Sequence, residues 1–210
     1  MYDLEEQEKL DALKTFWKEN GRLIVAAALA FAVGLGAVQG WRYYSRTQAQ
    51  AASALFAKLE EAQRGNDTGQ TQSIGARILG EYGRTAYGPM AAFVLADDRY
   101  RAGEREAAAT HLQWVIDRTG DEEIAALARL RLAGIRLEEK KYDEALKLLE
   151  SRTTDAFSSQ YSDLRGDVLV AQGKLAEAKA AYKQALDNGS EQSQWRSFVQ
   201  LKLDALGSAP

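Results

Sequence analysis

An uncharged apolar run at residues 23–41 constrains the fold of this chain more than any other feature. Its nineteen residues contain no charged side chain, and only Gln39 is strongly polar. As a helix it would extend roughly 28 Å, close to the ~30 Å hydrocarbon core of a bilayer. Trp41, Tyr43 and Tyr44 stand at its C-terminal end, where aromatic side chains favour the membrane interface. The sequence therefore predicts one uncleaved transmembrane helix.

Three other interpretations of this run fit less well. A cleaved signal peptide has a short basic start and a small-x-small cleavage site, whereas here 22 residues of mixed charge come first. A buried core helix rarely stays free of charge for so long. An interfacial helix needs a polar face, which this segment lacks.

The predicted organisation has three parts: a tail at 1–22, the membrane helix at 23–41 and a domain at 42–210. Four basic residues precede the apolar run, and three follow it before residue 60. This slight excess mildly favours a cytoplasmic N-terminus with the C-terminal domain on the other side of the membrane.

Small residues recur every four positions within the apolar run, at Ala28, Ala32, Gly36 and Gly40. Such a stripe allows a second membrane helix to approach closely, so it is a candidate helix-packing face. The alternative is that small residues are simply common in membrane helices.

Beyond Arg46 the sequence shows helical spacing of apolar residues and no strand-like alternation, which predicts an all-α domain. Short turns rich in glycine or charge separate the segments into pairs. The expected helices cover about 47–64, 69–82, 89–102, 104–118, 121–140, 142–152, 158–172, 175–188 and 191–206.

These pairs follow a repeat. Units that start near Pro89, Ala126 and Ser159 place alanine at their twentieth position, at Ala108, Ala145 and Ala178. The alanines are separated by 37 and then 33 residues, close to the tetratricopeptide period of about 34. Small residues at positions 8 and 20 allow close helix crossing, and glycine at position 15 ends the first helix of a pair. The sequence therefore predicts a tetratricopeptide-like, right-handed α-solenoid.

The last predicted helix would close this stack. Its apolar residues fall along one face, with polar residues such as Arg196 and Lys202 opposite: Trp195, Phe198, Val199, Leu203 and Leu206. This pattern is typical of a terminal capping helix, and a partner-docking helix is the alternative.

The sequence contains no motif that indicates catalysis or cofactor binding. A net charge of −3 argues against nucleic-acid binding, and without cysteine there is no disulfide or thiolate metal site. His111 is the single histidine, and no phosphate-binding glycine loop is present. Acidic residues 121–123 fit a helix start, and residues 138–141 read as a solvated turn. We expect no enzyme activity, cofactor or metal.

A helical solenoid of this kind can instead bind polypeptides along its inner face. Positions 2, 5, 9 and 12 of each unit would line that groove, although several, Leu130 above all, could be packed between helices. The candidate partner-binding residues are Met90, Phe93, Asp97, Tyr100, Leu127, Leu137, Gln160, Asp163, Asp167 and Val170, with Gly134 beside them.

Several segments resemble the bacterial YfgM family. They are Glu19-Asn20-Gly21 before the apolar run, Gly40-Trp41-Arg42-Tyr43-Tyr44 after it, Leu130-Arg131-Leu132-Ala133 and Leu164-Arg165-Gly166-Asp167. The resemblance implies a single-pass protein of the bacterial inner membrane, N-terminus inside, with a periplasmic tetratricopeptide-like domain. It also implies association with the SecYEG translocon and its membrane-anchored chaperone PpiD.

Two functional hypotheses remain from the sequence. The first is an adaptor or chaperone-like subunit at the Sec translocon, binding translocon partners, a PpiD-type chaperone or emerging secretory chains. The alternative is a scaffold or regulator of another envelope assembly, in cell-wall or outer-membrane biogenesis. The sequence leaves the client and the oligomeric state open.

Overall fold

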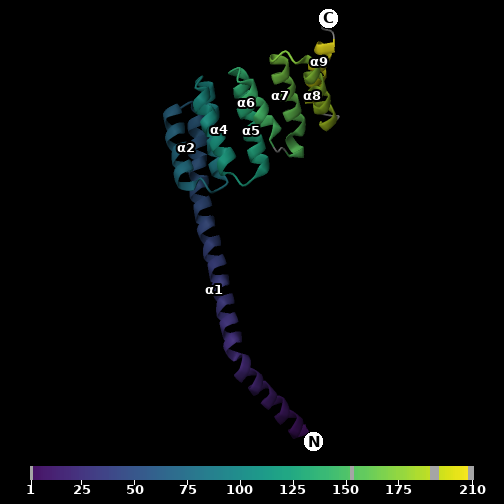
Figure 1. Ribbon diagram of the computed structural model, residues 1–210. Helices are drawn as coiled ribbons and strands as arrows, with labels where there is room; N and C mark the ends of the chain where they lie inside the picture. The colour runs from purple at the N-terminus through teal and green to yellow at the C-terminus, as the bar shows by residue number, and fades with distance from the viewer. Residues whose placement is uncertain (1, 152–153, 190–193, 208–210) are drawn as a thin grey trace. The chain divides into compact units, whose positions relative to one another are not determined.

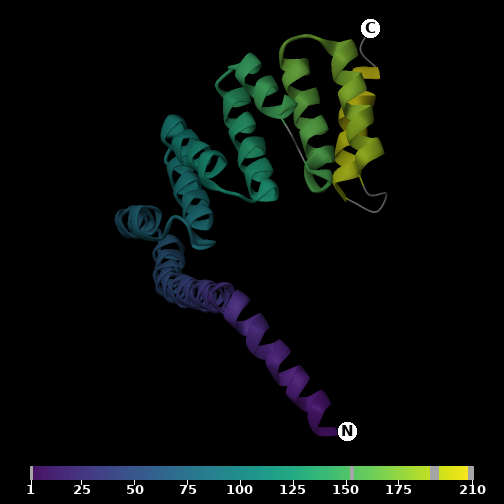
Figure 2. The same cartoon turned by 60° about the horizontal axis from the view of Figure 1, so that its bottom comes forward.

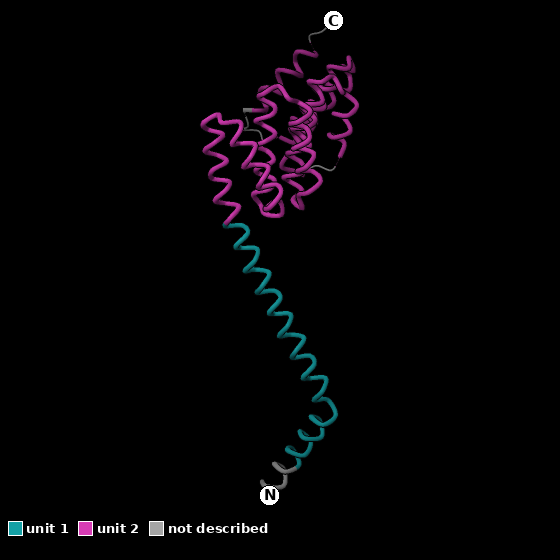
Figure 3. The backbone as a smooth tube through the Cα atoms, turned by 90° about the vertical axis from the view of Figure 1, so that its left-hand side faces the viewer, with its two compact units in different colours: residues 1–50 teal, residues 51–210 magenta. Residues whose placement is uncertain are grey.

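The computed structural model describes residues 2–151, 154–189 and 194–207. Over these residues it contains nine α-helices, one short 3-10 helix and no strand, which confirms the all-α prediction. The chain divides into two compact units, residues 1–50 and residues 51–210 (Figure 3). The helices are α1 (Tyr2–Arg64), α2 (Thr68–Tyr82), α3 (Tyr87–Arg101), α4 (Arg105–Arg118), α5 (Glu122–Glu138), α6 (Tyr142–Glu150), η1 (Asp155–Phe157), α7 (Ser158–Ala171), α8 (Leu175–Asn188) and α9 (Gln194–Gly207).

The first helix is longer than the sequence analysis expected. The expected helix at 47–64 is the C-terminal end of α1, which continues without a break from the apolar run. No glycine or proline occurs between Trp41 and Arg64, so nothing in this stretch interrupts the hydrogen-bond ladder. The second compact unit accordingly begins at Ala51, inside α1.

The second unit is a stack of helix pairs, in which each helix lies beside its neighbour in the sequence (Figures 1 and 2). The end of α1 packs with α2 in one core cluster, and α3 pairs with α4, α5 with α6 and α7 with α8. Within each pair we call the first helix A and the second helix B. This arrangement agrees with the predicted two-helix repeat.

Close crossing within the pairs follows the predicted small positions. Ala108, Ala145 and Ala178 are all 0% exposed, because each lies where helix B meets the core. Gly166, at position 8 of the last pair, faces Tyr182 so closely that a Cβ there would overlap the tyrosine ring. The prediction that small residues at positions 8 and 20 allow close helix crossing is therefore confirmed for these residues.

The turns between helices A and B share one backbone conformation. Gly103 and Gly173 have φ values of +80° and +76°, as expected for glycine at position 15. The corresponding turns of the other two pairs use Asn66 and Lys140, with φ values of +52° and +60°. The first pair, whose sequence motif is degenerate, thus has the same turn as the others.

The last helix, α9, covers the end of the stack with a narrower apolar face than expected. Val199 is buried, and Leu203 and Leu206 pack against the same core. Phe198 is 63% exposed and Trp195 is 46% exposed, so the expectation that both face the core is wrong. Their place is taken by cations that the sequence analysis assigned to the solvent side: Arg196 donates to the Leu186 carbonyl, and Lys202 reaches two carboxylates.

Candidate functional site

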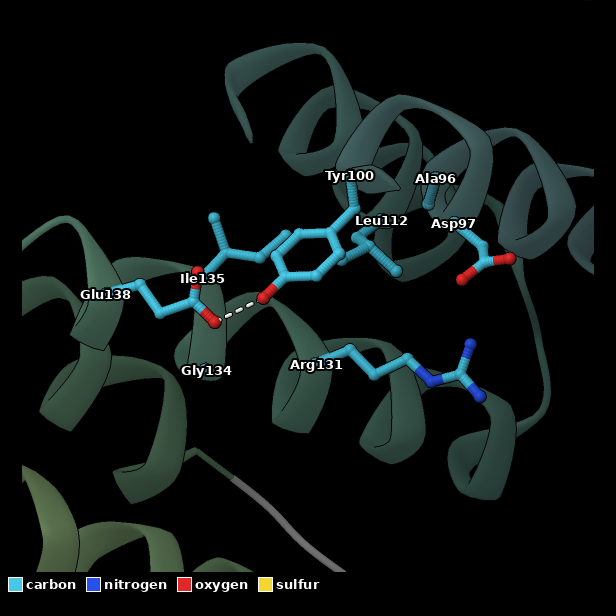
Figure 4. Close-up of a pocket in the computed structure, with 8 residues that line it drawn as sticks. All are labelled: Ala96, Asp97, Tyr100, Leu112, Arg131, Gly134, Ile135 and Glu138. Carbon is cyan, nitrogen blue, oxygen red and sulfur yellow. Dashed lines mark hydrogen bonds between the residues drawn. The ribbon is translucent and has the colours of Figure 1, made fainter. Parts of the chain in front are cut away.

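A pocket with a cavity volume of about 280 Å³ opens between α3 and α5, the A helices of two consecutive pairs. Its floor is apolar and its rim is polar (Figure 4). The lining residues are Ala96, Asp97, Tyr100, Leu112, Arg131, Gly134, Ile135 and Glu138. The pocket therefore lies on the A-helix side of the solenoid, where the sequence analysis placed a groove.

One end of the rim is held together by hydrogen bonds from two other helices to Glu138. Tyr100 of α3 donates its phenol proton to Glu138 Oε1, and Arg105 Nε of α4 donates to Oε2 at 3.0 Å. These contacts hold the pKa of Glu138 below its usual value, chiefly through the Tyr100 hydrogen bond. The same hydrogen bond raises the pKa of Tyr100. At this end of the rim, the Glu138 carboxylate is therefore held in place and links the α3–α4 pair to the α5–α6 pair.

The other end of the rim carries both signs of charge. The guanidinium carbon of Arg131 lies 4.8 Å from the centroid of the Phe93 ring, a cation–π contact. The Asp97 carboxylate accepts a hydrogen bond from Gln63 Nε2 at 3.2 Å and pairs with Arg101 at 3.0 Å. Arg131 and Asp97 both face this end of the pocket (Figure 4). A donor and an acceptor therefore flank an apolar floor, a combination that suits a peptide segment.

Gly134 borders open space in the pocket. A Cβ built on this residue would meet no atom within 4 Å. Ligand pockets for small molecules and cofactors have volumes of about 300–1,000 Å³. At about 280 Å³ this cavity is slightly smaller than that range, so its volume suits one large side chain of a polypeptide better than a cofactor.

The structure distributes the other predicted groove residues unevenly. Met90 and Val170 are exposed, whereas Phe93, Leu127, Leu137 and Gln160 are half-buried. Leu130 and Leu137 pack against the core cluster of α5–α7, as the alternative interpretation foresaw for Leu130. Asp97, Tyr100 and Gly134 are brought together in the pocket.

Asp163 departs from the expectation of an open groove. It is 2% exposed, and Lys202 Nζ lies 2.9 Å from its Oδ1. Asp167 accepts hydrogen bonds from the same ammonium at 2.8 Å and from Tyr182 Oη at 2.7 Å. Since α9 supplies the cation that binds both carboxylates, they are engaged in attaching the last helix.

The sequence analysis missed Arg131, Glu138 and Lys202. A usable signal existed for the first two, because residues 131, 134 and 138 share one face of α5. The interpretation of residues 138–141 as a solvated turn is wrong for Glu139, whose side chain is 14% exposed and pairs with Arg136 at 2.6 Å. Lys202 could not be recognised, because its partners are 35 and 39 residues away.

No catalytic arrangement accompanies this pocket in the described part of the chain. His111 is half-buried, and burial followed by the nearby charge of Arg99 lowers its pKa. Among the described residues, no group of three or more His, Cys, Asp or Glu could hold a metal ion. Asp121 caps α5 by accepting from the backbone N–H groups of Glu123 and Ile124, as expected for a helix start.

The other candidate feature is the apolar part of α1, described within the first compact unit alone. α1 is the one candidate membrane span among the described residues, and the most apolar 18-residue window has a mean hydropathy of 2.1 with 0% burial. A core helix would be buried, so this finding disfavours that alternative. Trp41, Tyr43 and Tyr44 are exposed, and a Cβ on Gly36 or Gly40 would meet no atom within 4 Å.

Comparisons with known proteins identify the family of this chain. The chain matches the family described as a tetratricopeptide repeat-like domain over residues 14–208. It is 32% identical over 204 residues to the ancillary SecYEG translocon subunit of Neisseria gonorrhoeae, which covers 97% of this chain and 98% of that relative.

Two further relatives carry the same description. The ancillary SecYEG translocon subunit of Haemophilus influenzae is 30% identical over 211 residues, covering 98% of this chain and 99% of the relative. That of Escherichia coli is 31% identical over 179 residues, covering 85% of each chain. The chain belongs to the YfgM family of ancillary SecYEG translocon subunits, with a tetratricopeptide repeat-like domain.

Proposed function

We propose that this chain is a membrane-anchored adaptor of the Sec translocon, which binds a partner polypeptide in the pocket between α3 and α5. The observation that carries the proposal is likeness to ancillary SecYEG translocon subunits over nearly the whole length, apolar run and repeats included. The role is binding rather than catalysis.

The anchor in this proposal is the segment 23–41, with the N-terminus in the cytoplasm and the repeat domain in the periplasm. The unburied apolar surface of α1 and the aromatic residues at its end support it. Two measurements test it. The full chain should stay in the membrane pellet after alkaline carbonate extraction, and a C-terminal alkaline phosphatase fusion should be active. An inactive fusion at normal expression would place the domain in the cytoplasm and remove any exported ligand.

The ligand in this proposal is a polypeptide that inserts one apolar side chain over Ala96, Leu112 and Ile135. Asp97 and Arg131 would then hydrogen-bond to its backbone on either side. Candidate sources are a segment of a PpiD-type chaperone or a secretory chain that emerges from the channel. Anchoring in the same membrane raises the effective concentration of such partners, so that one shallow pocket suffices.

Crosslinking from the pocket rim tests this proposal in cells. A photoreactive p-benzoylphenylalanine in place of Arg131, at the rim, should crosslink to SecY, SecE, SecG or a PpiD-like chaperone. The matched control carries the same group in place of Arg118, an exposed arginine on the B helix α4. Crosslinks to cell-wall or outer-membrane assembly proteins alone would instead favour the scaffold hypothesis.

Filling the pocket gives an independent test. Gly134→Trp adds a side chain where there is open space, so it should block the ligand without disturbing the core. The crosslinks from position 131 should then fall several-fold, while Gly134→Ala, which leaves most of the volume free, should retain them. Equal crosslinking by the two variants would exclude this pocket as the binding site.

The small-residue stripe of Ala28, Ala32, Gly36 and Gly40 completes the proposal as a contact for a partner's membrane helix. All four residues are exposed on α1, so this face is available. The double substitution Gly36→Leu and Gly40→Leu should reduce co-purification of SecYEG in mild detergent. The double substitution Ala27→Leu and Gly34→Leu, on the opposite side of the helix, is the control. Equal recovery in both variants would remove the stripe from the interface.

A further inference from the structure

The segment of α1 before the apolar run carries a second exposed apolar face. Leu10, Leu13, Phe16 and Trp17 are each between 53% and 63% exposed. Their spacing places them on one side of the helix. Asp11 and Thr15 lie on the opposite side, and Lys14 lies at the border, beside Leu10 and Trp17. Nothing in the described residues covers this apolar side.

This segment cannot be an extension of the membrane span. Residues 8–22 contain seven charged side chains, too many for the hydrocarbon core. A helix with one apolar face that includes Trp and Phe, and a polar face that includes lysines, is instead typical of the plane of the membrane interface. The charges nearly balance within this segment, so apolar contact rather than attraction to anionic lipid would dominate its binding.

The geometry of α1 supports the same conclusion. α1 bends within its N-terminal part (Figures 1 and 2). The indole of Trp17 lies 3.3 Å from the position a Cβ on Gly21 would take, so glycine allows the ring to lie against the backbone. A hollow of about 420 Å³ follows this part of α1 and is lined by Trp17, Gly21, Val25 and Leu29 together with Lys18 and Arg22. Because the hollow lies along a single helix, it marks the inner side of the bend.

The inner side of such a bend is the side that must contact lipid. A helix that leaves the bilayer and turns along its surface has the membrane on the inside of the turn. The apolar residue Trp17 lies on that side. Lys18 and Arg22 line the same hollow, and their long side chains can extend past the apolar surface to water and phosphates.

We propose that residues 8–21 form an amphipathic helix that lies in the membrane interface with Leu10, Leu13 and Trp17 in contact with lipid. The proposal rests on the membrane span of the proposed function, because the span holds this short segment against the bilayer. The occupant of the apolar face is the lipid surface itself.

Because the chain contains no cysteine, single-cysteine variants of the full chain test this placement directly. Leu10→Cys and Leu13→Cys report the apolar face, and the nearby variants Asp11→Cys and Thr15→Cys are matched controls on the polar face. Val33→Cys reports the span. Each variant is labelled with the environment-sensitive dye NBD and reconstituted at low protein-to-lipid ratio in vesicles of phosphatidylethanolamine and phosphatidylglycerol.

We expect blue-shifted emission and several-fold weaker iodide quenching for positions 10 and 13 than for positions 11 and 15. Equal quenching at all four positions, with position 33 still protected, would overturn the interfacial helix and leave the anchor intact. Exposure of position 33 would overturn the anchor as well. Protection of positions 10 and 13 that appears only at high protein-to-lipid ratio would assign the face to a second copy and overturn the lipid contact.

Discussion

Asp97 and Asp167 occupy the same repeat position, the ninth, in the second and the fourth helix pair of the solenoid, yet they have different surroundings. Asp97 stands at the rim of an open pocket, where the facing residues on α5 are Gly134 and Ile135. Asp167 instead contacts the ammonium of Lys202 from α9 and the phenol of Tyr182. The repeat position fixes which way a side chain points, and the next helix in the stack decides whether a groove remains.

Loss of the Lys202 cation at the α9 end should lower the free energy of unfolding more than any single change at the pocket. Lys202→Met removes the partner of Asp163, whose side chain is 3% exposed, and leaves a buried carboxylate unpaired. We expect a loss of about 2–3 kcal/mol in the free energy of unfolding, measured by urea denaturation of the full chain in detergent. Lys183→Met, at an exposed position on α8, is the control and should change it by less than about 0.5 kcal/mol. A similar small change for Lys202→Met would mean that the two carboxylates do not depend on α9.

Substitution by alanine should change the free energy of unfolding in opposite directions at two helical glycines, Gly166 and Gly134. A Cβ at Gly166 would overlap Tyr182, so Gly166→Ala should lower the free energy of unfolding by about 1–3 kcal/mol. A Cβ at Gly134 meets open space, so Gly134→Ala should raise it by roughly 0.5–1 kcal/mol through better helix propensity. Urea midpoints of the two variants check the signs. A loss at Gly134 as well would mean that the pocket floor is closed in solution.

The turns offer a smaller contrast between units. Gly103→Ala forces alanine to a φ of +80°, and we expect a loss of about 1 kcal/mol. Lys140→Gly relieves the same strain at a φ of +60° and should gain roughly 1 kcal/mol, offset in part by lost contacts of the lysine. Thermal melts of the two variants check these changes. Lys174→Gly is the control, because Lys174 has a negative φ and its substitution removes a lysine charge without relieving strain in the turn. Equal shifts at 140 and 174 would contradict the turn explanation.

The sequence predicted the architecture well, because it depends on local rules. Helical periodicity, small residues at crossings and glycine at turns identified the pairs, and the αL turn at Lys140 shows where residue preference alone fails. The pocket was predicted only in part. Asp97 and Tyr100 followed from repeat position, but Glu138 and Lys202 depend on contacts between units 33 to 39 residues apart. Such pairing is a property of the assembled stack, which no repeat motif encodes.

The two ends should also weaken at opposite extremes of pH. The pKa of Glu138 is held below its usual 4.5, so its contribution to stability is present above that value and is lost as the pH falls through the lowered pKa. Burial tends to lower the pKa of Lys202, but its hydrogen bonds to Asp167 and Asp163 outweigh burial and raise it above 10.5. That contribution is complete below pH 10.5 and is lost above it.

Urea midpoints from pH 3 to pH 11 can separate these two contributions. Both groups are more than a third exposed or close to it, so solvent screening should keep each effect below about 1 kcal/mol. Glu138→Gln should remove part of the acid-side decline and leave the alkaline side unchanged, because the amide carries no charge to lose. Lys202→Met should remove the alkaline-side decline, and its larger loss should shrink at acid pH, where the unpaired Asp163 carboxylate becomes protonated. If Glu138→Gln flattened the alkaline side of the profile as well, the pocket end and the α9 end would form one electrostatic unit, and the contrast between Asp97 and Asp167 would not hold.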